Sequence, residues 1–558
     1  MAVINGTLEN DNWDNALYGT EFADLINMKA GDDWLVQSYG SDGIFGGDGF
    51  DVVMYGDLSG GVIINQTNVE RLGVAAFSTL KDNGDIDSFD SVEAFHGTNF
   101  DDSIFISGDG YVFGGGGNDF LTSVATSGTN GFFLPGLGAD TVVGNGSTGI
   151  SYNEEVWDDP EIEALHRGIT VVVTDFNEGF VIDRGGFEDV FSGVAYVYGS
   201  LYNDVMIAGT GDANFEGLDG NDYLYGGSGN DFLDGGAGKN LLDGKSGSDY
   251  YEYEYDGNTT IRDESGTDTI ALIRPDDTYF EKMYYVGTTL KIESTDGDTL
   301  TIQKFSNIEF IHWTGPTFDY SISTADIFAG TLSNDSITTS TVGYVEVYAA
   351  DGNDTITVRA GGSWVSCDAG NDTAFGGSGG DLIFGDFRAD TFGNDSIKGL
   401  AGADSLYGDG GKDTLDGGSE NDLLEGGAGN DLLYGGTGMD ILTGGDGSDR
   451  FVFTLVTETT TGATTCDQIT DFVRVQDKID LGVIDASTIT TGNNSFVFKG
   501  TSAIGTLNDG EIYYRQFNNE GTDQDYTLVY IDNDKDVTAE AVIKLTGLVA
   551  LSSSDFVL

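Results

Sequence analysis

Large apolar residues recur every nine positions along several stretches of the chain, and an acidic or polar residue, most often aspartate, stands two positions before each. The longest stretch places this apolar position at Ile397, Leu406, Leu415, Leu424, Leu433, Leu442 and Phe451. Side chains alternate along a strand, so each apolar residue with its two neighbours predicts a short strand that buries one side chain. Three of the six intervals hold a hexamer of the form Gly-Gly-x-Gly-x-Asp, and the others hold glycine-rich variants of it. The hexamer predicts a turn, because no helix tolerates three glycines in nine residues.

The same nine-residue step organises shorter runs elsewhere in the chain. It places Asp24, Asp33, Asp42 and Asp51 near the start, and Asp204, Ala213, Asp222, Asp231, Asn240 and Asp249 farther on. A broken run contains Asp354, Asp372 and Asp381. One nonapeptide buries too little to fold alone, whereas stacked copies bury a continuous apolar ladder. Two nonapeptides would complete one coil of a two-sided roll, so the sequence predicts an all-β fold of parallel β-roll, or β-solenoid, arrays.

Aspartates that are 18 residues apart should be neighbours in such a roll, on successive turns of one side. Stacked carboxylates repel one another unless a cation lies between them. Ligation by oxygen alone in a glycine-rich loop suits Ca²⁺, whereas Zn²⁺ prefers His or Cys and Mg²⁺ gives up its water reluctantly. The alternative is that each aspartate only forms its turn. Seven aspartates from Asp395 to Asp449 at steps of nine favour calcium ligands over turn formers.

The nonapeptide resembles the signature of the RTX, or hemolysin-type, calcium-binding family, whose repeats form a parallel β-roll with Ca²⁺ between its turns. The resemblance implies several Ca²⁺ ions as cofactors and assigns metal ligation to the repeat aspartates: Asp24, Asp33, Asp42, Asp51, Asp204, Asp222, Asp231, Asp249, Asp354, Asp372, Asp381, Asp395, Asp404, Asp413, Asp422, Asp431, Asp440 and Asp449. Ala213, Asn240, Ser363 and Gly110 depart from the pattern, and an insertion at residues 390–394 breaks its phase.

A second repeat, in which Asp follows a Gly-Thr or Gly-Ser pair, opens the arrays, for example at Gly97, Gly199 and Gly330. Similar apolar segments, GGVIIN at 60–65 and GITVVV at 168–173, precede two of these pairs. We therefore predict a first roll unit over residues 1–145 and a second over 146–250. A β-rich connecting module over 251–315 and a third array over 316–449 would follow.

Residues 450–558 lack the glycine-rich repeat and end in Asp555-Phe556-Val557-Leu558. This region resembles the C-terminal module of serralysin-type metalloproteases, which implies an uncleaved signal for the type I secretion machinery. An open solenoid end must also be covered, so we expect the module to act as a β cap as well. The N-terminus has neither a basic start nor an apolar run, and so does not resemble a Sec-type signal peptide.

The composition and net charge of the chain exclude some classes of binding partner. With 94 acidic and 23 basic residues the formal charge is −71, which excludes a nucleic-acid binder that works by neutralising phosphates. Aspartate accounts for 70 of the acids, an excess that metal ligands or turns explain better than a generally acidic surface. No apolar stretch is long enough for a membrane span. Cys367 and Cys466 are the only cysteines, so we do not expect disulfides to carry the stability.

The sequence contains no convincing catalytic motif. His96, His166 and His312 form no H-E-x-x-H, and the G-x-S-x-G at residues 376–380 lies inside a repeat. We therefore predict a secreted, calcium-dependent, non-enzymatic protein of the extracellular space or cell surface, with a surface-layer, matrix or adhesion role. Its partners would be calcium, the secretion machinery, and either itself or a surface polysaccharide. The alternative is a polysaccharide-active enzyme or carbohydrate-binding subunit built on the solenoid.

Overall fold

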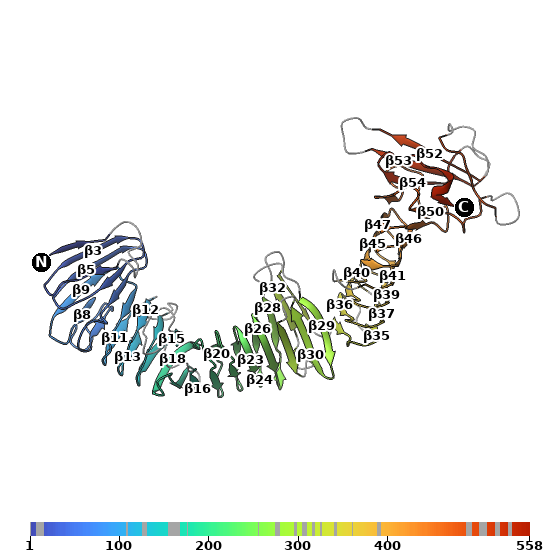
Figure 1. The fold of residues 1–558 in the computed structure, drawn as a ribbon. Coiled ribbons are helices and arrows are strands. Elements are labelled where there is room, and N and C mark those ends of the chain that lie inside the picture. The colour runs from blue at the N-terminus through green and yellow to red at the C-terminus, as the bar shows by residue number, and fades with distance from the viewer. Residues whose placement is uncertain are drawn as a thin grey trace. The chain divides into compact units, whose positions relative to one another are not determined.

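The structure is a computed structural model of the 558-residue chain. It describes residues 2–6, 16–107, 110–124, 131–153, 168–175, 177–254, 256–273, 280–294, 298–303, 308, 310–314, 319–323, 326–339, 343–359, 361–387, 392–486, 494–501, 510–518, 525–533 and 538–558. The chain divides into two compact units (Figure 1). Unit 1 comprises Met1–Tyr279 and Ser294–Ser321, and unit 2 comprises Phe280–Glu293 and Ile322–Leu558.

Both units are built from short strands, and the single helical turn in the described residues is η4 (Ser553–Asp555), so the all-β prediction is confirmed. In unit 2 two parallel sheets face each other. One contains β40 (Leu382–Phe384), β42 (Ser405–Tyr407), β45 (Leu423–Gly429) and β47 (Ile441–Gly447). The other contains β39 (Thr373–Gly377), β41 (Ser396–Ala401), β44 (Thr414–Ser419), β46 (Leu432–Thr437) and β48 (Arg450–Val452).

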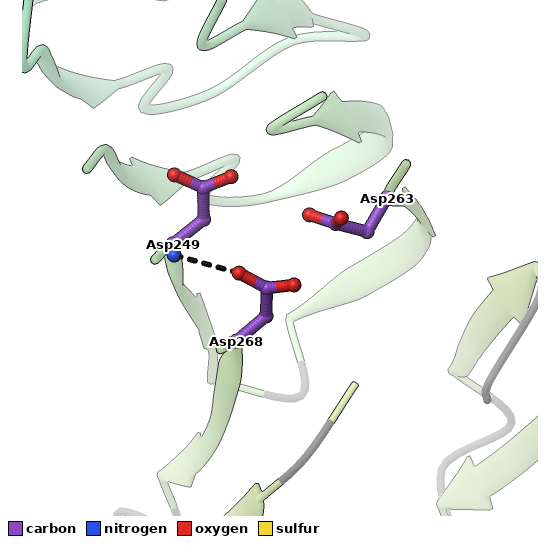
Figure 2. A group of neighbouring side chains, drawn as sticks. All are labelled: Asp249, Asp263 and Asp268. Carbon is purple, nitrogen blue, oxygen red and sulfur yellow. Dashed lines mark hydrogen bonds between the residues drawn. The ribbon is translucent and has the colours of Figure 1, made fainter. Parts of the chain in front are cut away.

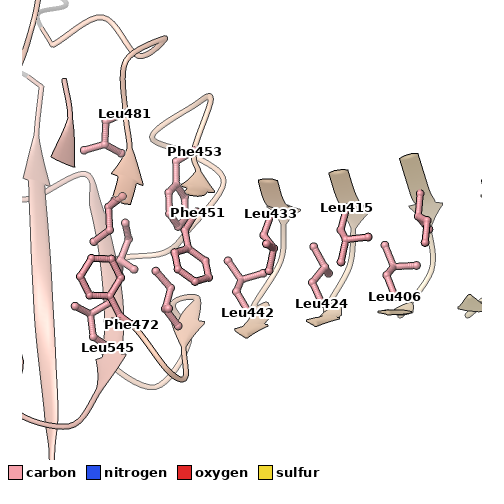
Figure 3. Close-up of a cluster of buried hydrophobic side chains, with 14 of the residues drawn as sticks. Leu406, Leu415, Leu424, Leu433, Leu442, Phe451, Phe453, Phe472, Leu481 and Leu545 are labelled. Atoms are coloured by element: carbon pink, nitrogen blue, oxygen red, sulfur yellow. The ribbon is translucent and has the colours of Figure 1, made fainter. Parts of the chain in front are cut away.

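The register within these sheets follows the repeat. Leu406 pairs with Leu424 and then Leu442 in one sheet, and Leu415 pairs with Leu433 in the other. Each is fully buried, and Figure 3 shows the two rows of side chains pointing toward each other between the sheets. The predicted ladder of single apolar residues is therefore the core of the roll.

Unit 1 is also a roll of parallel-paired strands, but antiparallel meanders interrupt it. Parallel pairs join β3 (Leu25–Ala30) to β5 (Gly43–Asp48) and β5 to β9 (Ile86–Asp90). Here an antiparallel meander is inserted, formed by β7 (Ile63–Asn65), β8 (Ser78–Leu80) and β9. A second meander of the same topology follows, with β16 (Thr170–Asp175), β17 (Glu178–Ile182) and β18 (Glu188–Tyr198). The two apolar segments noted in the sequence, 60–65 and 168–173, lie at the start of these meanders.

The roll of unit 1 continues beyond the nonapeptides. The strands that follow the second meander are β19 (Val205–Ala208), β20 (Asn214–Glu216), β21 (Tyr223–Tyr225), β22 (Phe232–Asp234), β23 (Gly238–Asp243), β25 (Tyr250–Tyr253), β26 (Gly257–Arg262) and β28 (Thr269–Ile273). β22 pairs with β25, and β25 pairs in parallel with β28, so the non-repetitive sequence after residue 250 adds further coils.

The C-terminal region covers the end of the roll in unit 2. β49 (Gln468–Ile469) pairs with β47, and β50 (Lys478–Asp480) pairs with β48, so both sheets extend past the last nonapeptide. β52 (Glu511–Phe517), β53 (Tyr526–Asp532) and β54 (Ala541–Thr546) form an antiparallel sheet joined to β49. The last strand, β55 (Phe556–Val557), pairs with β50.

Cys367 and Cys466 are both buried free thiols. Within the described residues, no helix has the length and apolar character needed to cross a membrane.

Candidate metal centres

The repeat aspartates of unit 2 form two continuous rows, one along each side of the roll. The backbone N–H of each aspartate donates to Oδ1 of the aspartate one coil later. The N···O distances are 2.8 Å for Asp395 to Asp413, 2.9 Å for Asp404 to Asp422, 2.8 Å for Asp413 to Asp431, 2.9 Å for Asp422 to Asp440 and 3.0 Å for Asp431 to Asp449. We call each such row a carboxylate ladder.

The second carboxylate oxygen is the chemically informative one. All seven side chains from Asp395 to Asp449 in the nine-residue series are at most 3% exposed. Their Oδ2 atoms accept no hydrogen bond from any described residue. Burying a carboxylate oxygen without a hydrogen-bond partner or counter-ion costs free energy. The ladder would therefore be stabilised by a cation, which the described residues of this array do not supply.

The glycines leave room beside these oxygens. A Cβ on Gly417, the first residue of the turn that ends in Asp422, would lie 2.4 Å from Oδ2 of Asp422. A Cβ on Gly429, where φ is +158°, would lie 1.4 Å from the carbonyl oxygen of Gly411 on the previous coil. Glycine is therefore required both beside the carboxylate and where successive coils touch, and backbone carbonyl groups lie close to both positions.

The electrostatics of the metal-free ladder are unfavourable. Burial, and after it the charge of neighbouring aspartates, raises the pKa of Asp413 and of Asp422 to about 8. Burial also raises the pKa of Asp395 to about 7. A divalent cation beside the Oδ2 atoms would stabilise the ionised form and reverse these shifts.

Both ladders continue across the insertion at residues 390–394, which shifts the phase of the nine-residue repeat. The N–H of Asp372 donates to Asp395 Oδ1 and that of Asp381 to Asp404 Oδ1, both at 2.8 Å and 23 residues apart. At the other end, the N–H groups of Asp440 and Asp449 donate to Asp467 and Asp477, each at 3.1 Å. The insertion therefore leaves the two rows intact, and both rows enter the C-terminal region.

Unit 1 brings its repeat aspartates together in the same way. The N–H of Asp24 donates to Asp42 at 2.7 Å, Asp33 to Asp51 at 3.1 Å, Asp204 to Asp222 at 2.7 Å and Asp231 to Asp249 at 2.9 Å. In unit 2, Asp354 donates to Asp372 at 2.7 Å, and at Ser363 the hydroxyl donates to Asp381. Every aspartate named from the sequence thus lies in a ladder.

Sequence reasoning missed other members of the unit 1 ladders. These are Asp87, Asp102, Asp119, Asp140, Asp189 and Asp268, which accept the N–H of an aspartate or other residue on the preceding coil. Insertions change their spacing to values such as 17, 21, 45 and 49 residues. Each still stands two residues before a buried apolar side chain, for example Asp119 before Leu121, and this local signal could have found them.

One ladder ends in a cluster of three carboxylates (Figure 2). Oxygens of Asp249, Asp263 and Asp268 lie within 4.8 Å of one another, and the three residues are at most 2% exposed. The N–H of Asp249 donates to Asp268 Oδ1 at 2.8 Å, and the Tyr251 hydroxyl donates to Asp263 Oδ2 at 2.5 Å. Oδ2 of Asp249 is buried and accepts no hydrogen bond from the described residues. The group is an all-oxygen site suited to a hard cation.

Comparisons with known proteins agree with this chemistry. Residues 15–53 and 216–251 match the family described as RTX calcium-binding nonapeptide repeat (4 copies). Residues 363–558 match the family described as Peptidase M10 serralysin C terminal. No curated protein gives a significant sequence match.

Two solved structures share limited similarity. The extracellular lipase LipA from Serratia marcescens is 16% identical, with a TM-score of 0.16; the match covers 65% of this chain but only 40% of the lipase. The AlgE6R3 subunit of the Azotobacter vinelandii mannuronan C5-epimerase is 25% identical, also with a TM-score of 0.16; the match covers 34% of this chain and 79% of the subunit.

The matched repeats bind calcium ions. The ladders fit that metal: they supply buried carboxylate oxygens that accept no hydrogen bond from the described residues, glycine carbonyls close to them, and a negative charge that a cation would offset.

Proposed function

We propose that this secreted, calcium-binding chain, which carries RTX repeats and a serralysin-like C-terminal module, acts outside the cell as a calcium-dependent surface-layer, matrix or adhesion protein. In this proposal calcium is structural. The ions join successive coils, and the folded protein then offers its surface to other copies of itself or to the cell surface.

The observation that carries the proposal is the distribution of the unpartnered carboxylates. They recur on coil after coil of both units, for example at Asp222, Asp231, Asp413 and Asp431, instead of converging on one cleft. Sites spread in this way stabilise every coil equally, which is what an extended scaffold needs. We assign the repeat aspartates and the Asp249–Asp263–Asp268 cluster as calcium ligands on this basis.

The C-terminal module supports export before folding. Asp555 is fully buried, accepts the N–H of Val475 at 3.1 Å and pairs with Arg474, while Phe556 packs on Phe498 with ring centroids 5.2 Å apart. The terminal residues are therefore covered in the folded protein. A type I exporter would read them in the unfolded chain, which the low calcium of the cytosol keeps open.

Imaging of the native cell surface with and without a calcium chelator tests the structural role. We expect a regular layer or matrix in Ca²⁺ that dissolves on chelation and returns when Ca²⁺, but not Mg²⁺, is restored. A protein that stays freely dispersed around intact cells at millimolar Ca²⁺ would argue against the proposal.

A specific feature of unit 1 favours a second candidate, the binding of neutral polysaccharide. A cavity of about 520 Å³ is lined by the aromatic rings of Trp34, Phe50, Tyr111, Phe132 and Tyr198. Consecutive rings lie 5.3–5.4 Å apart from Phe50 to Tyr198, one per coil. No charged residue lines the cavity among the described residues, which suits an uncharged ligand with apolar faces.

Affinity electrophoresis through gels containing starch, cellulose ether or agarose tests this candidate. We expect retardation by at least one of these polymers that Tyr111→Ala removes. Tyr223→Ala is the matched control, because Tyr223 is similarly exposed in unit 1 but does not line the cavity. Equal mobility in all three gels would eliminate the neutral glycans tested as ligands.

A further inference from the structure

Two ladders of unit 1 end in the same way but carry opposite charge at one position. The first runs from Asp24 through Asp42 to Asp87, and the other from Asp231 through Asp249 to Asp268, each joined by N–H to Oδ1 hydrogen bonds of 2.7–2.9 Å. In each ladder a further buried side chain approaches the last two aspartates. It comes from the turn that immediately precedes the last aspartate in the sequence. It is Lys81 in the first ladder and Asp263 in the other.

The Lys81 ammonium lies within an all-oxygen shell. Its Nζ atom is 2.9 Å from Oδ2 of Asp87 and forms an ion pair with Oδ2 of Asp42 at 3.6 Å, although this oxygen accepts no hydrogen bond from the described residues. All three side chains have no exposed surface. It also donates to the backbone carbonyls of Ser38 at 2.5 Å and Gly40 at 2.9 Å. Two ladder carboxylates and two carbonyls of a glycine-containing turn are the donor types that a calcium ion would use at this step.

The turn that carries Lys81 is held in place. Lys81 follows β8, its N–H donates to the carbonyl of Asp85 at 2.9 Å, and β8 pairs with β9, which carries Asp87. The Tyr55 hydroxyl donates to Oδ2 of Asp87 at 3.2 Å. The meander therefore fixes the position of the Lys81 ammonium between two coils. At this position the positive charge comes from the chain itself.

The other ladder has the opposite arrangement. Asp263 adds a third carboxylate to Asp249 and Asp268, with oxygens of all three within 4.8 Å of one another. Oδ2 of Asp249 is buried and accepts no hydrogen bond among the described residues. The two basic residues nearest in sequence have other partners, since Lys245 pairs with Asp243 at 3.2 Å and Arg262 donates to Gln303 at 3.0 Å.

We propose that Lys81 is a built-in replacement for calcium at the Asp42–Asp87 step, whereas the Asp249–Asp263–Asp268 cluster binds a Ca²⁺ ion of its own. The inference rests on the proposed calcium function of the ladders. Its consequence is that the first ladder end holds together without calcium, while the other end requires it.

Hydrogen exchange on the wild-type full chain tests the contrast directly. The N–H groups of Asp42 and Asp249 occupy equivalent places, donating to Asp87 and Asp268. As Ca²⁺ is lowered with chelator, we expect the Asp249 amide to lose protection at a higher Ca²⁺ concentration than the Asp42 amide. Loss of both protections at the same Ca²⁺ concentration, or of Asp42 first, would overturn the proposal.

Calcium counting by equilibrium dialysis tests it with variants. Lys81→Ala leaves the two carboxylates and the carbonyls in place, and we expect one additional bound Ca²⁺ per chain. Asp263→Asn should weaken one site about tenfold or more, because ligand charge sets calcium affinity. Lys398→Ala and Glu254→Gln are the controls: both alter one exposed or partly exposed charge away from any ladder, and neither should change the count.

The outcomes separate this inference from the proposed function. A wild-type chain that binds no calcium at millimolar concentrations refutes the calcium ladders themselves. A wild-type chain that binds several ions, with unchanged counts and affinities in Lys81→Ala and Asp263→Asn, refutes only the roles of these two residues. Should Lys81→Ala fail to fold, the wild-type exchange experiment still decides between the two roles.

Discussion

The long array of unit 2 and the ladders of unit 1 both bury rows of neighbouring carboxylates, but the two regions differ in what lies beside these charges. In residues 395–449 every ladder aspartate has a buried Oδ2 that accepts no hydrogen bond from the part of the chain that the structure describes, so we expect each coil to need a cation. In unit 1, by contrast, the Lys81 ammonium lies beside the ladder carboxylates of Asp42 and Asp87, where we propose that it takes the place of a calcium ion. We therefore expect the regular array to depend on calcium at every coil, and the departures from the repeat to change that dependence from place to place.

Asn240 illustrates a second kind of replacement. Its Oδ1 accepts the N–H of Asp222 at 2.9 Å, as an aspartate would, and its Nδ2 donates to the carbonyl of Gly236 at 2.6 Å. The amide is thus hydrogen-bonded at both of its polar ends, to the preceding coil through Oδ1 and within its own turn through Nδ2. We therefore expect an asparagine at a ladder position to keep the contact between coils without a cation.

Calcium removal should give the largest effect. With EGTA we expect loss of the β signal in circular dichroism, greatest in the unit 2 array, because the net charge of −71 opposes compaction and metal binding supplies folding free energy. Ca²⁺ at roughly 10⁻⁴–10⁻³ M, the range of extracellular calcium modules, should restore it. Equal Mg²⁺ should not. An unchanged spectrum and melting curve in chelator would contradict the calcium-dependent fold.

Truncation at the C-terminus should give the next largest effect. Deleting about the last 60 residues removes β52, β53, β54 and β55. We expect this truncation to retain the protein inside cells and to leave β49 and β50 each with one exposed edge, because they lose β54 and β55. Assaying medium and cell fractions measures export.

Phe556→Ala separates the two roles of this module. Phe556 is 7% exposed and packs on Phe498, so its loss should destabilise the cap by about 3 kcal/mol. If the module serves only as a cap, the truncated chain will still be secreted; if it carries the export signal, Phe556→Ala will be exported more efficiently than the truncation.

The regular part of this architecture could be predicted from the sequence because its period is local. The alternation of one apolar residue and one aspartate over nine positions predicts both the buried ladder, such as Leu424 on Leu442, and the adjacency of Asp422 and Asp440. Stacking of identical coils allows no other register that buries the same apolar residues.

The irregular part could not be predicted because it depends on insertions. Asp42 meets Asp87 across 45 residues and Asp140 meets Asp189 across 49, and no fixed spacing connects them. A lysine within an acidic chain gives no sequence signal that it is buried between two carboxylates, since lysine is almost always exposed. The two-unit division and the five predicted segments also use different boundaries, and the segment boundaries stay a prediction.

Exchanging aspartate and asparagine between the regions should have an intermediate effect. Asp422→Asn keeps the Oδ1 acceptor for Asp404 and, by analogy with Asn240, places an amide that can donate to its own turn. We expect weaker and less cooperative calcium binding, and a metal-free array that is more stable, because a buried unpaired oxygen is removed.

The opposite substitution, Asn240→Asp, tests the same difference between aspartate and asparagine in unit 1. Asn240→Asp should strengthen calcium binding next to Asp222 and make this coil of unit 1 calcium-dependent. Titration calorimetry and chelator melting curves measure both variants. Identical calcium stoichiometry and affinity in wild type and Asp422→Asn would show that the aspartate only forms its turn, for which changes within about 0.5 kcal/mol are expected.

The smallest effect should be a linkage between calcium binding and the protonation of ladder carboxylates, such as those of the unit 2 array. Burial raises the pKa of Asp413 and Asp422 to about 8 in the metal-free fold, against an ordinary value of 3.8. Because the folded state binds these protons more tightly than the unfolded chain, the stabilisation they give the metal-free fold is complete below about pH 4. It is lost as pH rises through about 8.

Calcium must displace the same protons, so the sign for binding is opposite. Calcium affinity should rise between pH 6 and about pH 8 and then level off, with protons released on binding. Calorimetry in buffers of different ionisation enthalpy measures this release. Glu420→Gln is the control, since hydrogen bonds from Ser419 and Gly402 lower the pKa of this exposed group out of the window. Binding without proton release at pH 7 would mean that the ladder carboxylates are already ionised before calcium arrives, which would contradict the raised pKa values of Asp413 and Asp422.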